Sequence, residues 1–174
     1  DAYTIRERLG SLDGVRIAIV GDIKHSRVAR SDVAAFTRLG AEVVLVGPPT
    51  LLPPSLVGWP VTVSHRLDQV LEAVDVIYLL RMQHERMNEA LVPSLREYTE
   101  LYGLTAQRTE RVRDDVVIMH PGPMNRGVEI SQEATEHPGA VITDQVANGV
   151  AVRMAVLFRL LGSESQLDVL RVAD

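Results

Sequence analysis

The 174-residue chain contains no cysteine, which excludes disulfide bonds and thiolate metal ligands and fits a reducing compartment. Aromatic residues make up only 4% of it, so the core must be built mainly from Val, Leu, Ile and Ala. No run approaches the roughly 18 apolar residues that span a bilayer, and the net charge of −5 disfavours a nucleic-acid surface. These absences predict a cytoplasmic globular protein with neither a membrane nor a nucleic acid as partner.

What the chain has instead is a series of short apolar runs rich in β-branched residues. Because these runs are continuous rather than alternating, they predict strands buried on both faces, as in a parallel sheet. A chain of this length can bury a core of its own, so we expect one domain. The predicted strands are Val15–Val20, Glu42–Val46, Val61–Val63, Val74–Leu80 and Val116–Met119.

Helical patterns separate these strands. Ser26–Leu39 carries a single apolar face and is followed by Gly40 as a helix stop, and Leu67–Leu71 predicts a second crossover helix. The alternation of strand and helix predicts an α/β fold. We expect a three-layer α/β/α domain with a doubly wound, mostly parallel, Rossmann-like sheet of about five strands.

The two ends of the chain carry helices of another kind. Asp1–Leu9 is helix-like, and the chain opens on Asp rather than Met, which fits either a processed or trimmed chain or a piece of a longer protein. Asp144–Leu161 is apolar almost all round, although Arg153 and Arg159 interrupt it, and Gly162 ends it. Such a helix must be buried against something. One domain face does not suffice to cover it, so the pattern indicates a missing partner surface.

Ligands of open parallel sheets bind beyond the carboxyl ends of the strands, so the residues that follow each strand are the most informative. Charged and polar residues gather in three such loops, 21–27 (GDIKHSR), 81–86 (RMQHER) and 120–127 (HPGPMNRG). The predicted topology brings all three to one edge of the sheet. The first loop lacks the further glycines of a dinucleotide fingerprint and has no Walker A pattern, so Gly21 is interpreted as a tight strand-to-helix turn.

Two arginines in these loops are candidate ligands for an anion. Arg27 lies near the start of a predicted helix, where the helix dipole gives a cation no advantage. A bound anion would explain it, and so would an ion pair with Asp22 or Glu85. Arg81 directly follows a strand, Gln83 would point the same way in an extended chain, and Glu85 could hold the guanidinium in place. Since each guanidinium can grip a carboxylate through two hydrogen bonds, the pair suits a small dicarboxylate, with a structural role as the alternative.

The segment His120-Pro121-Gly122-Pro123 is the most specific part of the three loops. Its prolines remove backbone donors and fix φ, which leaves carbonyls free to accept hydrogen bonds, and an X-Pro bond here is a candidate cis peptide. A rigid turn that caps a buried strand is the alternative. His120 is interpreted as a hydrogen-bonded structural residue rather than a base. The sequence has no metal-ligand spacing, no G-x-S-x-G elbow and no cysteine nucleophile, so neither a metal site nor a nucleophile is assigned.

Taken in order, these motifs resemble the second domain of aspartate carbamoyltransferases. The resemblance runs from Asp1–Ile5 through GDIKHSRVARS and LLRMQHERM to HPGPMNRGVEI and DQVANGVAVRMAVL, and so covers nearly the whole chain. Ornithine carbamoyltransferases share the fold, but their proline loop typically reads His-Cys-Leu-Pro. The sequence His-Pro-Gly-Pro and the lack of cysteine favour aspartate.

The resemblance implies that the α-amino group of L-aspartate attacks the carbonyl carbon of carbamoyl phosphate, giving N-carbamoyl-L-aspartate and phosphate in pyrimidine biosynthesis. It implies no cofactor and no covalent enzyme intermediate, because catalysis rests on positioning and electrostatics. Arg27, Arg81 and Gln83 would bind aspartate, and Glu85 would orient Arg81. Some relatives have a lysine where His84 stands, so no charge-based role is carried over to that residue.

For carbamoyl phosphate, the resemblance implies contacts with the carbonyls of Gly122 and Pro123, with a cis peptide before Pro123. Some relatives have leucine in place of Gly122, which keeps the carbonyl but changes the stiffness of the loop. Lys24 and His120 would support these ligands from behind.

The family's Ser-Thr-Arg-Thr phosphate cradle and His-Pro-x-Gln segment precede the part that resembles this chain. The resemblance therefore implies that residues 1–174 are the aspartate-binding domain of a longer enzyme, with interdomain helices at 1–10 and 144–162, and that the chain alone is inactive. It also implies that Arg86–Arg113 closes over substrate and that the intact enzyme is a homotrimer, with regulatory chains or a dihydroorotase as further candidate partners. The alternatives are an ornithine-type carbamoyltransferase and a catalytically dead homologue that serves binding or assembly.

Overall fold

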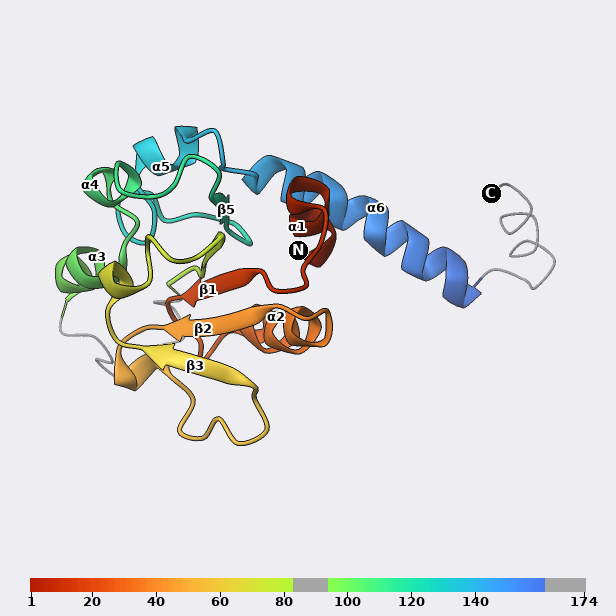
Figure 1. Cartoon of the computed structure of the whole chain (residues 1–174), viewed down its shortest axis with the longest axis horizontal. Helices are drawn as coiled ribbons and strands as arrows, with labels where there is room; N and C mark the ends of the chain where they lie inside the picture. The colour runs from red at the N-terminus through yellow and green to blue at the C-terminus, as the bar shows by residue number, and fades with distance from the viewer. Residues whose placement is uncertain (83–93, 162–174) are drawn as a thin grey trace.

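The computed structural model describes residues 1–82 and 94–161, which form a five-stranded sheet with helices on both faces (Figure 1). The spatial order of the strands is β3-β2-β1-β4-β5, and all of them run parallel. The chain therefore steps outward on one side of β1 and then on the other, which is a doubly wound arrangement. The strands are β1 (Arg16–Val20), β2 (Glu42–Val46), β3 (Val61–Ser64), β4 (Val76–Leu79) and β5 (Val117–Met119).

The predicted strands are confirmed to within two residues at each end, as is the helix that follows β1. The crossover expected at Leu67–Leu71 is shorter than predicted and forms only a single 3-10 turn. The α-helices are α1 (Ala2–Leu9), α2 (Arg27–Arg38), α3 (Leu95–Tyr102), α4 (Ala106–Thr109), α5 (Gln132–Glu136) and α6 (Ile142–Leu161), and the 3-10 turns are η1 (Pro49–Leu51) and η2 (Leu67–Gln69).

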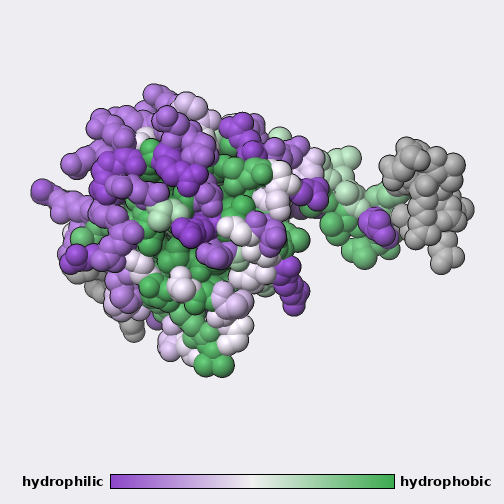
Figure 2. All heavy atoms as spheres, viewed as in Figure 1, coloured by the Kyte–Doolittle hydropathy of each residue, from purple (hydrophilic) through white to green (hydrophobic). Residues whose placement is uncertain are grey.

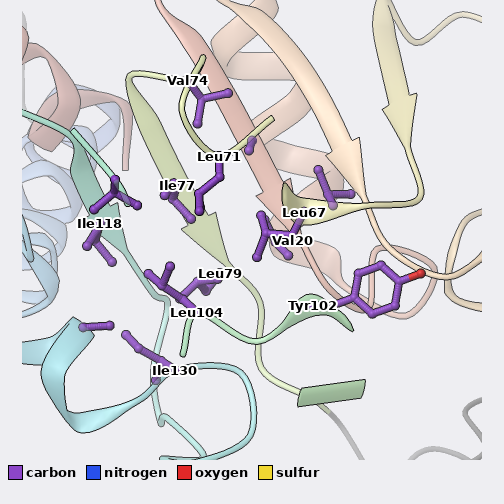
Figure 3. Close-up of a cluster of buried hydrophobic side chains, with 14 of the residues drawn as sticks. Val20, Leu67, Leu71, Val74, Ile77, Leu79, Tyr102, Leu104, Ile118 and Ile130 are labelled. Atoms are coloured by element: carbon purple, nitrogen blue, oxygen red, sulfur yellow. The ribbon is translucent and has the colours of Figure 1, made fainter. Parts of the chain in front are cut away.

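Each face of the sheet packs against a different group of helices, which confirms the expected three layers. Successive residues of a strand point to opposite faces. Ile17 and Ile19 of β1 pack with apolar residues of α1 and α2, whereas Ala18 and Val20 pack with those of η2, α3 and α5. Burial of an isoleucine or valine side chain such as these stabilises the fold by about 1.5–3 kcal/mol. Figure 3 shows the second cluster, which includes Leu67, Leu71, Ile77, Leu79, Leu104, Ile118 and Ile130.

Helix α6 leaves the body of the domain and projects beyond it (Figure 1). Helix α1 lies beside its first part, where Asn148 Nδ2 donates to Thr4 Oγ1 (3.2 Å) and Glu7 Oε2 (2.6 Å). The described residues do not bury α6 as predicted. Figure 2 shows hydrophobic residues, in green, on the surface of its projecting part. No described helix has the length and apolar character needed to cross a membrane. The most exposed apolar residues of α6 are Val146, Val150, Met154, Val156, Leu160 and Leu161.

Residues 94–113 pack into the core rather than lying over it. Tyr98 and Tyr102 of α3 are buried, and Leu104 and Val112 join the same apolar cluster. Of the stretch predicted to close over substrate, 86–93 lies outside the described residues. In the described remainder, these buried contacts argue against free movement.

Arg108 of α4 fixes this segment to the crossover between β3 and β4. Its side chain is 10% exposed and forms a two-pronged ion pair with Asp68, from Nε to Oδ1 (3.1 Å) and from Nη2 to Oδ2 (2.7 Å). The same guanidinium donates to the carbonyls of Gly103 (2.7 Å) and Glu100 (2.8 Å). The hydrogen bonds from Arg108 lower the pKa of Asp68. One arginine thus closes the end of α3 and ties it to η2.

A second polar group lies inside the face that carries α2. Asp32 is buried, and its Oδ2 has no hydrogen-bond partner among the described residues. Gln145 Nε2 donates to the hydroxyl of the neighbouring Tyr78 (3.1 Å). Burial raises the pKa of Asp32 to about 7, outweighing the opposing effects of the first amino group of the chain and the Tyr78 hydroxyl. The protonated acid is therefore the form that suits this interior.

Replacing Arg108 with methionine should lower the free energy of unfolding by about 2–4 kcal/mol, because the stem stays buried while Asp68 and the carbonyls of α3 lose their donor. Urea unfolding followed by circular dichroism would measure this. Arg111→Met is the matched control, since Arg111 binds the same Asp68 but is 42% exposed. Equal effects of both changes would contradict a special role for the buried guanidinium.

The raised pKa of Asp32 predicts that stability declines with rising pH. The folded state keeps a proton that the unfolded chain releases near its ordinary pKa of 3.8. The free energy of unfolding should therefore fall between about pH 4 and pH 7, by up to roughly 4 kcal/mol from this group. Asp32→Asn should remove that part of the decline, as measured by urea unfolding at pH 5 and pH 8. Asp114→Asn, at an exposed position, should keep the wild-type dependence, and an unchanged slope in Asp32→Asn would refute the assignment.

Candidate functional site

The beginnings of three polar loops lie side by side at the carboxyl edge of the sheet, as predicted, and of the second loop the structure describes Arg81 and Met82. β1 pairs directly with β4, and β4 pairs with β5, so the loops that follow these strands are neighbours. Leu80 N–H donates to Val20 O (2.8 Å) at the base of the first two loops. Asn125 Nδ2 donates to Met82 O (3.2 Å) and joins the second loop to the proline loop. In Figure 1 the arrowheads of β1, β2 and β3 point to the side of the domain on which α3 lies.

Gly21 opens the first loop at a point where the backbone has no room for a side chain. Its φ is +126°, and an added Cβ would lie 2.9 Å from the Tyr98 hydroxyl and 3.3 Å from Leu80 Cβ. The strand-to-helix turn interpreted from the sequence is therefore correct. The additional constraint is the buried Tyr98 of α3, which packs against the loop from behind.

The first loop is held by a pair of residues within it. Asp22 is buried, and its Oδ1 and Oδ2 lie 2.9 and 3.0 Å from His25 Nδ1, while Oδ1 also accepts from His25 N–H (3.2 Å). The ion pair between Arg27 and Asp22 that the sequence left open is thus not formed. Ser26 caps α2 by accepting a hydrogen bond from Ala29 N–H (3.0 Å).

These contacts place Arg27 on the first turn of α2 with its side chain exposed. The Arg27 guanidinium has no hydrogen bond or ion pair with another described residue. Lys24 is half-buried, and its backbone N–H donates to Leu51 O (2.8 Å). Arg81 is half-buried and follows Leu80, beside Gly21. Gln83 and Glu85, the other predicted ligand and its neighbour, lie outside the described residues.

The proline loop is built around His120. The imidazole is fully buried, with Nε2 3.1 Å from Glu129 Oε1, and its Nδ1 accepts a hydrogen bond from Gly122 N–H (2.9 Å). Because Nδ1 accepts from a backbone donor, the ring proton belongs on Nε2, facing the carboxylate. His120 is therefore the hydrogen-bonded structural residue that the sequence predicted, and it supports the loop from below.

The corner itself presents carbonyl groups. The Gly122–Pro123 peptide bond is cis, as the resemblance implied, and Gly122 has a φ of +62°. Pro121 and Gly122 are half-buried and Pro123 is exposed, and none of their carbonyls accepts a hydrogen bond from a described residue. Such groups can receive N–H donors from a ligand. Together with the arginine-bearing loops, the edge can hold an anion on one side and an amide-like donor on the other.

Two residues that shape this edge were missed from the sequence. Glu129 and Gln145 are both buried, and Gln145 Oε1 accepts a hydrogen bond from His120 N–H (3.1 Å). The only local signal was a charged residue within the apolar run Val128-Glu129-Ile130. Among the described residues, no group of three or more His, Cys, Asp or Glu side chains is arranged to hold a metal ion.

Comparison with known proteins shows the family to which this chain belongs. Residues 13–160 match the family described as aspartate/ornithine carbamoyltransferase, Asp/Orn binding domain. The aspartate carbamoyltransferase catalytic subunit of Thermobifida fusca is 59% identical over 162 residues, which cover 93% of this chain and 52% of the relative. The corresponding subunit of Acidothermus cellulolyticus is 57% identical, covering 93% of this chain and 50% of its own. The chain thus spans about half the length of the curated relatives it matches.

Solved structures show the same fold. An aspartate transcarbamoylase from Trypanosoma cruzi in complex with carbamoyl phosphate superposes with a TM-score of 0.78 at 30% identity, covering 89% of this chain and 52% of that one. The ornithine carbamoyltransferase from Pyrococcus furiosus gives a TM-score of 0.76 at 25% identity, with the same coverage. The chain belongs to the aspartate/ornithine carbamoyltransferase family, in which it corresponds to the Asp/Orn binding domain.

Proposed function

We propose that this chain is the aspartate-binding half of an aspartate carbamoyltransferase, which transfers the carbamoyl group of carbamoyl phosphate to L-aspartate. The observation that carries the proposal is the meeting of two arginine-bearing loops with a corner whose carbonyls accept no hydrogen bond from a described residue, in a chain 59% identical to a catalytic subunit named for this activity. The His-Pro-Gly-Pro corner, without the cysteine typical of ornithine enzymes, supports aspartate as the acceptor.

In this proposal Arg27 and Arg81 bind the two carboxylates of aspartate, with Gln83 assisting. The carbonyls of Gly122 and Pro123 receive the amino group of carbamoyl phosphate. The α-amino nitrogen of aspartate forms a bond to the carbamoyl carbon, and the bond from that carbon to the phosphate oxygen breaks. Phosphate leaves with the electron pair of that bond and takes up the proton that the amine loses. Positioning of two reactants in a closed site can supply several kcal/mol of the barrier reduction.

We propose that the rest of the site comes from an amino-terminal half of the enzyme, as the family resemblance implies. The helices at 1–10 and 144–162 would pack against that half. Support comes from the exposed apolar surface of α6, from its contacts with α1, and from the share of the relatives that the chain covers. We further propose that the complete enzyme works in the cytoplasm as a homotrimer, as the family resemblance implies.

The purified chain alone should form no detectable carbamoyl aspartate, because it carries only part of the proposed site. A coupled assay for phosphate release, with the complete Thermobifida fusca subunit as positive control, would measure this. Joining the chain to the amino-terminal half of that subunit should produce turnover with aspartate and not with ornithine. Turnover by the chain alone would contradict the two-part site, and a joined enzyme that binds aspartate without turnover would favour the dead-homologue alternative.

In the complete enzyme, Arg27→Gln and Arg81→Gln should each raise the KM for aspartate by roughly 30-fold or more, since a charge-assisted hydrogen bond to a carboxylate is lost. Arg81→Lys should not restore binding, because an ammonium group cannot make the paired contact of a guanidinium. Binding of carbamoyl phosphate, measured by calorimetry, should change little. Arg38→Gln, at the exposed far end of α2, is the matched control. A wild-type KM in either glutamine variant would remove that arginine from the site.

A further inference from the structure

A single carboxylate beneath the proline corner accepts hydrogen bonds from two parts of the loop. Glu129 is 1% exposed, and its Oε1 accepts from Asn125 N–H (2.6 Å) and lies 3.1 Å from His120 Nε2. Its other oxygen, Oε2, is buried and has no hydrogen-bond partner among the described residues. Removing a carboxylate from water costs free energy, so the burial of Glu129 requires an explanation beyond packing.

The carboxylate determines which nitrogen of His120 carries the proton. An acceptor beside Nε2 favours the tautomer that is protonated there, and that tautomer leaves Nδ1 free to accept. The Gly122 N–H donates to this Nδ1 (2.9 Å). Without the carboxylate, the ring could equally carry its proton on Nδ1, and two donors would then face each other.

The same hydrogen bond sets the orientation of the corner. The N–H of Gly122 and the C=O of Pro121 belong to one peptide unit, and a trans peptide holds these groups on opposite sides. With the N–H directed at the buried ring, the Pro121 carbonyl is turned away from it. The carbonyls of Gly122 and Pro123 come next along the chain. Their directions relative to this plane are set by the torsions of Gly122, whose φ is +62°, and of Pro123, whose ring restricts φ.

Asn125 connects Glu129 to the second loop through two hydrogen bonds. Its backbone N–H is held by Glu129, while its side-chain amide donates to Met82 O (3.2 Å), one residue beyond Arg81. One buried carboxylate is thus connected both to the carbonyl corner and to the strand end that bears an arginine.

We propose that Glu129 is a positioning residue for carbamoyl phosphate, acting through His120 to fix the plane of the Pro121–Gly122 peptide and so to direct the carbonyls of the corner at the amino group of the substrate. This inference rests on the proposed function. Glu129 and His120 touch the loop rather than the substrate, and their effect is on binding geometry.

The test uses the complete enzyme and two substitutions of Glu129. Glu129→Leu should weaken carbamoyl phosphate binding at least about 10-fold in calorimetric titration without aspartate, while the KM for aspartate at saturating carbamoyl phosphate changes less than roughly 3-fold. Glu129→Gln retains an Oε1 acceptor for the Asn125 N–H and should recover most of the loss. Glu133→Leu, at an exposed position on α5, is the control and should bind like the wild type.

Nitrogen NMR of the His120 ring gives a readout that general destabilisation does not produce. The wild type should show the Nε2–H tautomer, and Glu129→Leu should lose that preference while the protein remains folded. If Glu129→Leu does not fold, the pair His120→Asn and His120→Gln takes its place. Asparagine puts an acceptor near the position of Nδ1 and glutamine reaches that of Nε2, so His120→Asn should bind carbamoyl phosphate more tightly.

The outcomes separate the two proposals. A wild-type enzyme that transfers no carbamoyl group to aspartate overturns the proposed function, and the positioning role with it. An active wild type whose Glu129→Leu variant binds carbamoyl phosphate normally overturns the positioning role alone. The reverse order of binding in the two His120 variants has the same consequence.

Discussion

β1 is hydrogen-bonded in parallel to β2 on one side and to β4 on the other, and the loops of the candidate site take their positions from this pairing. It sets the end of β1 between the ends of its two neighbours, where the chain has little space. A Cβ on Gly47 would lie 2.8 Å from Gly21 O, and one on Gly21 would meet Tyr98 and Leu80. Backbone-to-backbone packing at this edge therefore fixes the path by which the chain leaves the sheet and reaches the first turn of α2.

Polar pairs, each with at least one buried member, then hold two of the three loops in place. Asp22 with His25 holds the first loop, and Glu129 with His120 holds the proline loop. Away from the site, Arg108 with Asp68 holds the segment around α3 and α4. In each case a group that is costly to bury is satisfied by a partner on the same loop or a neighbouring one, so displacement of the loop would leave a buried polar atom without its hydrogen bond. Asp32 and Glu129 each also keep one buried carboxylate oxygen without a hydrogen-bond partner among the described residues, and at Asp32 burial favours the neutral acid.

Much of the fold could be predicted from the sequence, because its signals are local. Continuous β-branched runs marked the strands, and the residues directly after them marked the loops that meet at the sheet edge. The sequence could not reveal Glu129 or Gln145, because their roles arise from partners 9 and 25 positions away that only the folded chain brings close. Nor could it give the length of the crossover before β4, where tertiary packing accepts one 3-10 turn in place of a helix. The segment from residue 94 was expected to be part of a stretch that closes over substrate, yet Tyr98, Tyr102 and Leu104 anchor it in the core.

The outward apolar surface of α6 also bears on the fate of unassembled copies. Single soluble chains rarely display contiguous apolar patches larger than a few hundred Å², and side chains such as Val150, Met154 and Leu160 lie open along this helix. Copies that find no covering surface would adhere to one another as their concentration rises, and they carry the kind of surface that chaperones and proteases act on in cells. Separating the domain from the surface that covers α6 would therefore expose it to aggregation and proteolysis.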